Sequence, residues 1–189
     1  MPKRKIQFSY FILGGYLLGM LVTMLLRRGL IFPRDWLEMV GLLVGGWLGW
    51  VIVWFDKIAY VFILHPEVQL SQYVNYYIKK KDYKSALNLI NKRGGEMDKL
   101  TTRSAMFQVA WVVLAVFAVT SIGSMFGRIL VMGLGLRMLF ENWEGYVKNK
   151  MSLKRKLFWQ IKREISNDEL KWYVYGMTGV FVWLTLILV

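Results

Sequence analysis

Cysteine is missing from this chain, and histidine occurs once, at position 65. Without cysteine there is no disulfide framework, no thiolate nucleophile and no thiolate metal site. A metal site would have to be built from carboxylates with at most one imidazole, so we expect no metal and no cofactor. The missing thiols leave the redox compartment undetermined.

Familiar catalytic motifs are missing as well. The sequence has no Walker-type glycine loop, no Gly-x-Ser-x-Gly elbow and no His-Glu-x-x-His helix, which removes the usual anchors of ATPases, serine hydrolases and zinc proteases. His65 is a weak catalytic candidate, because a general base needs a substrate group within reach and a histidine beside Pro66 is equally typical of a solvated turn. An enzyme is therefore the less favoured interpretation.

Acidic residues are scarce, with 12 Asp and Glu against 25 Lys and Arg. In a membrane protein such an excess reports orientation and contact with anionic lipid. The basic residues flank apolar segments and no nucleic-acid-binding module is found, so nucleic acid is not an expected partner.

Apolar residues, by contrast, are abundant: they make up 56% of the 189 residues, more than a soluble domain normally tolerates. A hydrocarbon core of about 30 Å is crossed by roughly 20 apolar residues in a helix, and several segments approach that length. The composition predicts an all-α integral membrane protein with about five membrane-embedded helices, and four spans plus a re-entrant element is one arrangement that fits.

The alternation of apolar and polar stretches divides the chain into five regions. We predict a membrane hairpin at 1–56, a cytoplasmic helical hairpin at 57–103, a membrane hairpin or re-entrant element at 104–143, a basic amphipathic helix at 144–166 and a terminal membrane span at 167–189. The basic start and first apolar run resemble a secretory signal, but no small-residue cleavage site follows Leu26. We expect this run to be retained as the first span.

The polar region 66–103 has a helical period that restarts after a lysine-rich turn, with Asp82 as the expected N-cap. This predicts an αα-hairpin outside the bilayer. Residues 81–89 resemble the start of the second helix of a tetratricopeptide repeat, with Tyr83 and Ala86 in similar places. A solenoid of that family needs about three repeats, whereas one unit is present, so region 66–103 is interpreted as a single hairpin that offers a surface to a protein partner.

Glycines recur at four-residue spacing in the first two apolar runs. Gly41, Gly45 and Gly49 share one helix face, and so do Gly15 and Gly19, which allows a neighbouring backbone to approach closely. We expect these two faces to pack against each other within the first hairpin. A dimer through the same glycines is the alternative, so a homo-oligomer stays open.

Two arginines, Arg128 and Arg137, bracket the second arm of region 104–143. Charge inside a membrane is costly and is a default indication of function. Arg137 can also pair with Glu141 one helical turn later. We favour structural anchoring over a substrate or ion site.

The basic tract near the carboxyl end combines cations with an apolar face, which is typical of a helix lying in an anionic interface. The expected lipid contacts are Lys154, Arg155, Lys156, Lys162 and Arg163.

Charge also predicts orientation. Nine Lys and Arg lie in 57–103 and eight in 148–171, and both groups should face the cytoplasm. The chain between them must then enter and leave the membrane on one side. The amino terminus is expected to be cytoplasmic and the carboxyl terminus external, in a plasma or inner membrane, although the arginines at 27, 28 and 34 oppose this orientation.

Three functions follow from these features. The favoured one is a non-enzymatic scaffold or accessory protein that docks a partner or anionic lipid on its cytoplasmic face. A small transporter or channel subunit, with the arginines lining a path, is the alternative. A membrane-bound lipid enzyme is the third.

Overall fold

The computed structural model describes residues 2–28, 34–93, 97 and 100–188. Within these residues every regular element is helical and no strand occurs. The α-helices are α1 (Pro2–Arg28), α2 (Arg34–Ala59), α3 (Gln69–Lys79), α4 (Tyr83–Arg93), α5 (Ala105–Ser121), α6 (Met125–Lys148), α7 (Lys150–Leu157) and α8 (Asn167–Leu188). A π-helical turn, η1 (Tyr60–Leu64), follows α2, and a 3-10 turn, η2 (Thr101–Arg103), precedes α5. The expected all-α class is confirmed.

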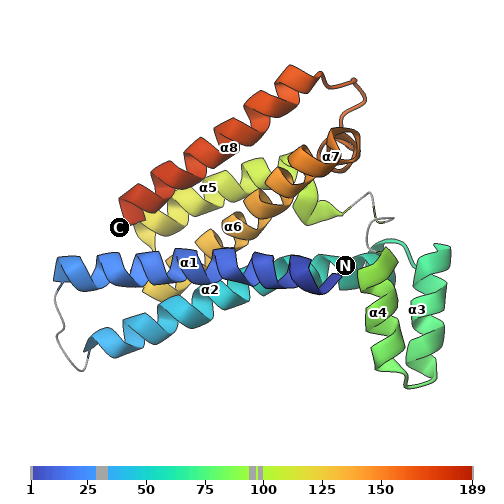
Figure 1. Cartoon of the computed structure of the whole chain (residues 1–189), viewed down its shortest axis with the longest axis horizontal. Helices are drawn as coiled ribbons and strands as arrows, with labels where there is room; N and C mark the ends of the chain where they lie inside the picture. Colours follow the sequence, from blue (N-terminus) through green and yellow to red (C-terminus); the bar gives the residue numbers. More distant parts are fainter. Residues whose placement is uncertain (1, 29–33, 94–96, 98–99, 189) are drawn as a thin grey trace.

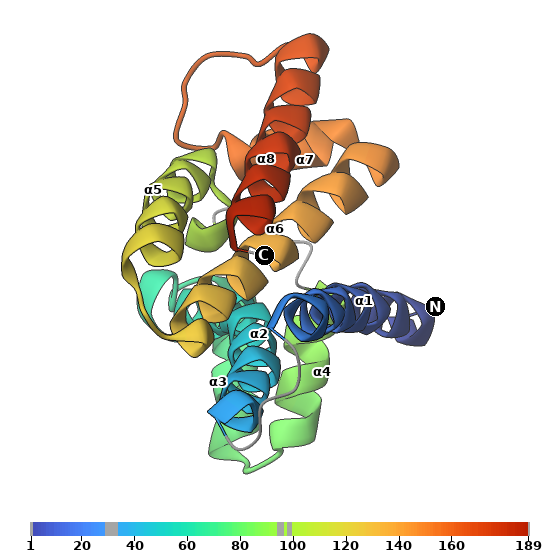
Figure 2. The same cartoon turned by 90° about the vertical axis from the view of Figure 1, so that its left-hand side faces the viewer.

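The apolar helices α1, α2, α5, α6 and α8 form a bundle with α6 at its centre. Helix α6 contacts each of the other four and also the basic helix α7. The α3–α4 hairpin projects from one end of this bundle, and α7 lies toward the same end (Figure 1). The turn between α5 and α6 and the carboxyl end of α8 lie at the opposite end. Figure 2 shows α6 passing between α2 and α8. The long polar segments thus share one end of the molecule.

Two helical stretches are long and apolar enough to cross a membrane. They are Trp36–Leu64, with 29 residues, and Asn167–Leu188, with 22. Tyr10–Leu26 and Ala105–Ser121 are shorter apolar helices. The buried core helix of a soluble protein can meet the same criterion. The fraction of each helix that is exposed on the surface of the protein therefore bears on whether it lies in a membrane.

The second helix continues further than the sequence pattern suggests. Asp56 and Lys57 interrupt the apolar run, yet α2 passes through them to Ala59 and continues into the π-helical turn. Asp56 is tolerated because two donors from Thr102 satisfy its carboxylate. The next helix, α3, begins at Gln69, three residues after Pro66.

Nearby side chains cap the start of two helices, and one of them is the predicted N-cap Asp82. The backbone N–H of Ser85 donates to Oδ1 of Asp82 at 3.0 Å, and hydrogen bonds from Ser85 hold the pKa of Asp82 below its usual value. Ser166 and Glu169 form a reciprocal capping box, with N–H donors 2.8 and 3.1 Å from the partner's side-chain oxygen. Local sequence therefore determines where α4 and α8 begin.

Region 104–143 contains a hairpin of two long helices. At 1.5 Å per residue, the 17 residues of α5 rise about 25 Å and the 24 residues of α6 about 36 Å. Arg128 closes the turn, because its Nε donates to the carbonyl oxygen of Ile122 at 2.6 Å.

The basic amphipathic helix expected over 144–166 is much shorter. Residues up to 148 belong to α6, α7 covers only Lys150–Leu157, and 158–166 are turns and irregular backbone. Leu153 and Leu157 are buried against Leu170 and Val174 of α8. The apolar face of α7 therefore packs on protein, because the start of α8 supplies an apolar surface that sequence periodicity alone does not show.

The glycine face of α2 packs against α6, so the expected partner was wrong. A Cβ atom added to Gly45 would lie 2.6 Å from the carbonyl oxygen of Phe126, and one added to Gly49 would lie 2.0 Å from that of Leu130. Gly41 also faces Phe126, at ordinary contact distance. The two backbones thus approach as closely as glycine allows.

The glycines of α1 are not in this contact. A Cβ added to Gly15 or Gly19 would have no atom within 4 Å. On α6, by contrast, Gly133 faces the carbonyl oxygen of Gly46 at 2.5 Å from its added Cβ. Glycines on both helices therefore let the backbones of α2 and α6 come into contact.

Replacing Gly49 by Ala puts a methyl group against the Leu130 carbonyl, so α2 and α6 must separate. We expect Gly49→Ala to lower the melting temperature of the detergent-solubilised protein, at an overpacking cost of about 1–3 kcal/mol. Gly15→Ala is the matched control, and its melting temperature should stay the same or rise because Ala has the higher helix propensity. Equal melting temperatures for the two variants would contradict the α2–α6 contact.

Candidate functional site

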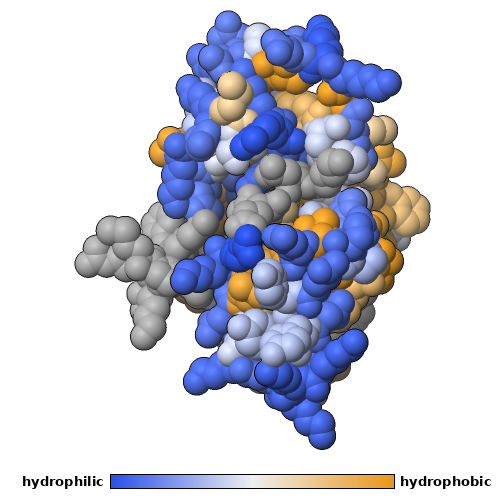
Figure 3. All heavy atoms as spheres, turned by 90° about the vertical axis from the view of Figure 1, so that its right-hand side faces the viewer, coloured by the Kyte–Doolittle hydropathy of each residue, from blue (hydrophilic) through white to orange (hydrophobic). Residues whose placement is uncertain are grey.

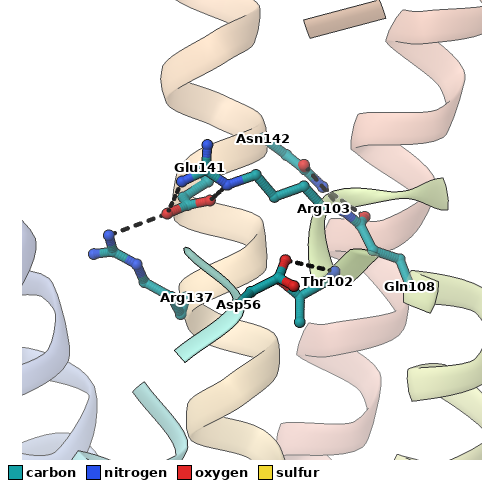
Figure 4. A network of polar contacts seen from close by, with 7 residues as sticks. All are labelled: Asp56, Thr102, Arg103, Gln108, Arg137, Glu141 and Asn142. Carbon is teal, nitrogen blue, oxygen red and sulfur yellow. Dashed lines mark hydrogen bonds and ion pairs between the residues drawn. The ribbon is translucent and has the colours of Figure 1, made fainter. Parts of the chain in front are cut away.

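Charged side chains from three elements meet near the polar end of the bundle (Figure 4). Nε of Arg103, in η2, lies 2.7 Å from Oε2 of Glu141 on α6, and Nη2 of Arg103 donates to Oε1 at 3.1 Å. Nη2 of Arg137 lies 3.1 Å from the same Oε1, as the four-residue spacing predicted. One carboxylate that is only 13% exposed therefore joins two guanidinium groups.

A second carboxylate ties α2 to the start of α5. The backbone N–H and the hydroxyl of Thr102 donate to Oδ2 of Asp56 at 2.9 and 2.7 Å. Asp56 is buried, and these bonds fix η2 beside α2. Because Arg103 is the next residue, this anchor also positions the guanidinium that reaches Glu141.

A pair of buried amides links α5 to α6. Nε2 of Gln108 donates to Oδ1 of Asn142 at 3.2 Å, and Nδ2 of Asn142 donates back to Oε1 of Gln108 at 2.8 Å. The hydroxyl of Tyr173, on α8, donates to the same Oε1 at 2.9 Å. These polar groups are satisfied by one another, which is the condition for burying them at low cost.

Two aromatic rings also lie close to the Arg137 guanidinium. Its guanidinium carbon lies 5.0 Å from the ring centroid of Trp50 and 5.8 Å from that of Phe140, within the range of cation–π attraction. Trp50 and Phe140 also contact each other, with centroids 6.0 Å apart. Arg137 is therefore fixed between a carboxylate and an aromatic wall.

A cavity of about 720 Å³ lies beside this cluster, between α2, α6 and α7. Arg103, Arg137 and Glu141 line it, together with further lysines and aromatic residues. Its size is within the range of small-ligand sites. In the described part of the chain, no group of three His, Asp or Glu side chains is placed to hold a metal ion.

The other predicted site residues lie elsewhere. Nδ1 of His65 is 3.3 Å from Oε1 of Glu67, at the break before α3, and His65 does not line the cavity. Arg128 is in the first turn of α6, beside the α5–α6 turn that it closes. The structure therefore separates Arg128 from Arg137, although the sequence pattern grouped them.

The five basic residues expected to contact lipid also have different surroundings. Lys156 lines the cavity, and Arg163 pairs with Glu169. Arg155 and Lys162 are exposed, and Lys154 is half-buried. They lie along α7 and the irregular segment after it, so they do not share one helix face.

Sequence reasoning missed Arg103, Asp56 and the Gln108–Asn142 pair. For Gln108 the available signal was a single polar side chain in the otherwise apolar stretch 105–119, which must find a partner when it is buried. The partner of Asp56 is 46 residues away and that of Asn142 is 34 residues away, so spacing could not identify either.

Comparisons of the chain with protein-family models, with curated proteins and with solved structures return no match.

Removing the Glu141 charge should leave two largely buried guanidinium groups without their shared partner. We expect Glu141→Gln to destabilise the protein by on the order of 3 kcal/mol, measured by thermal unfolding in detergent. Glu67→Gln is the control, because Glu67 is 69% exposed and exposed ion pairs contribute little. If the two variants melt alike, Glu141 does not hold the cluster together.

Proposed function

We propose that this chain is a multi-pass integral membrane protein that works as a non-enzymatic adaptor, with a basic cytoplasmic face that contacts anionic lipid and presents the α3–α4 hairpin to a partner. The observation that carries the proposal is a wide, exposed apolar surface around the bundle, bounded at one end by polar and basic helices.

The exposed apolar residues come from several helices. Phe11 on α1, Val113 on α5 and Leu186 on α8 are 76%, 68% and 69% exposed. Only 33% and 28% of the most apolar stretches in Trp36–Leu64 and Asn167–Leu188 are buried inside the protein. Soluble monomers rarely expose contiguous apolar surface on this scale. Exposing this apolar surface to water would be unfavourable, and a surrounding lipid bilayer removes that exposure.

The polar end of the bundle differs sharply from its sides. Figure 3 looks onto the end that carries the hairpin, and hydrophilic residues cover most of that face. Both basic stretches, 57–103 and 148–171, contribute to this end (Figure 1). The positive-inside rule then favours a cytoplasmic location for it. The C-terminal end of α8 would be external.

Lipid contact at this end has support from α7 and the segment that follows it. Met151 and Ile161 are exposed apolar residues next to the exposed cations Arg155 and Lys162. Each Lys or Arg close to an anionic membrane surface contributes about 1 kcal/mol. The exposed cations and apolar side chains together suit the interfacial layer of a bilayer.

A conducting function has less support. The polar cluster lies near one end of the bundle, and α2 and α6 touch backbone to backbone along Gly45 and Gly49. A path for ions or solutes between these two helices would need the contact to open. The adaptor interpretation requires no such movement.

The cysteine-free chain allows a direct test of orientation. Single cysteines replace the exposed residues Lys84 on α4, Arg155 on α7 and Ser124 in the α5–α6 turn, in protein inserted into native membranes. A membrane-impermeant thiol reagent should reach Lys84→Cys and Arg155→Cys from the cytoplasmic side and Ser124→Cys from the external side. Labelling of Lys84→Cys and Arg155→Cys from opposite sides would refute the proposed topology.

Lipid contact is tested by the composition of the lipid that surrounds the protein. We expect bilayer discs cut from membranes with a maleic-acid copolymer to contain more anionic lipid around the wild type than around the variant Arg155→Gln/Lys162→Gln. The difference should shrink as salt shortens the Debye length. The matched control is Lys79→Gln/Lys84→Gln on the hairpin, which should keep the wild-type composition. Identical composition in all three proteins would remove the lipid-contact role of α7.

A further inference from the structure

The cavity between α2, α6 and α7 has more positive than negative charge in its walls. Its cationic side chains are Lys57, Arg103, Arg137, Lys148 and Lys156. Two carboxylates, Glu141 and Glu144, also line it. The walls therefore carry an excess of three positive charges, and a site of this kind favours an anionic ligand.

The cluster in its wall is held in place before any ligand arrives. Glu141 fixes the Arg103 and Arg137 side chains at 2.7 and 3.1 Å, and the Trp50 ring stacks near Arg137. Planar guanidinium groups match the oxygens of phosphate in a bidentate way. Among common anions, a phosphate ester makes the best use of two positioned arginines with lysines beside them.

Part of the cavity wall, contributed by α2, is aromatic. Trp47, Val51 and Trp54 of α2 line the cavity and follow one another at helical spacing on the same side. Ten residues of helix separate Trp47 from Lys57, a rise of about 15 Å. Trp47 is half exposed, as are the neighbouring α2 residues Leu43 and Val44. The cavity thus runs from cations at its polar end to an apolar strip that reaches the lipid-facing surface.

From this arrangement we propose that the cavity binds one anionic phospholipid, with its phosphate among Arg103, Arg137, Lys57 and Lys156 and an acyl chain along Trp47 and Trp54. The inference rests on the proposed membrane location and orientation, which put the charged end at headgroup depth. It differs from the surface contact of α7, because it specifies a single site inside the fold. A soluble phosphate compound would use the cations but not the aromatic strip.

The test is native mass spectrometry of the full chain after delipidation in detergent, with added dioleoylphosphatidylglycerol, dioleoylphosphatidylcholine or glycerol phosphate. Wild-type protein should retain one phosphatidylglycerol per chain, and neither phosphatidylcholine nor glycerol phosphate should reach the same occupancy. Lys57→Gln/Lys156→Gln should raise the Kd at least about tenfold, since each lost charge-assisted bond contributes roughly 1.5 kcal/mol or more.

The matched control is Lys79→Gln/Lys84→Gln, which removes the same charge from the exposed α3–α4 hairpin outside the cavity and should leave the Kd unchanged. Equal weakening in both double variants would overturn the cavity site while leaving the surface contact of α7 intact. Glycerol phosphate binding as tightly as the lipid would overturn the lipid assignment. If the cavity variant does not fold, Trp54→Ala provides the second test. This variant should weaken the binding of dioleoylphosphatidylglycerol more than the binding of dihexanoylphosphatidylglycerol. Equal weakening of the two would contradict an acyl chain along Trp54.

Discussion

The close approach of α2 and α6 is the contact on which the rest of the structure depends. Carbonyl oxygens of α6 lie where the Cβ atoms of Gly45 and Gly49 would be, so any larger side chain would separate the two helices. Helices in a lipid environment associate through packing and polar contacts, because apolar side chains are as well solvated by lipid as by another helix and no hydrophobic driving force acts between helices. A flat glycine face is one of the few devices that makes such packing specific.

That crossing also determines where the charged cluster forms. On α2, Trp50 directly follows Gly49 and Asp56 lies two turns beyond it, and on α6 Arg137 and Glu141 lie one and two turns beyond Gly133. The carboxyl-terminal parts of α2 and α6, beyond this close contact, line the cavity with charged walls. Within the described residues, Asp56 and Glu141 each accept from donors on another element. The cluster therefore joins α2, η2 and α6 at the same end of the bundle.

Local features of this fold could be predicted from sequence, and contacts between distant elements could not. The Asp82 cap acts over three residues, so spacing was enough to identify it, and the Ser166–Glu169 box has the same short range. Spacing also identified the Arg137–Glu141 pair. The partner of the α2 glycines depends on which helix lies alongside, and two glycine-bearing helices were available, so the expected partner was wrong. The apolar side chains of α7 are buried against α8. The basic, mildly apolar sequence of α7 does not indicate this partner, so the extent of the helix could not be predicted.

The most direct measurement is a high-resolution structure of the full chain in bilayer discs containing phosphatidylglycerol. It should show the bilayer around α1, α2, α5, α6 and α8, with α3, α4 and α7 on one side. Gly49 should be in contact with the Leu130 carbonyl, and headgroup density should lie beside Arg137 and Lys156. A structure in which α2 and α6 are apart, or in which lipid surrounds the α3–α4 hairpin, would contradict this account.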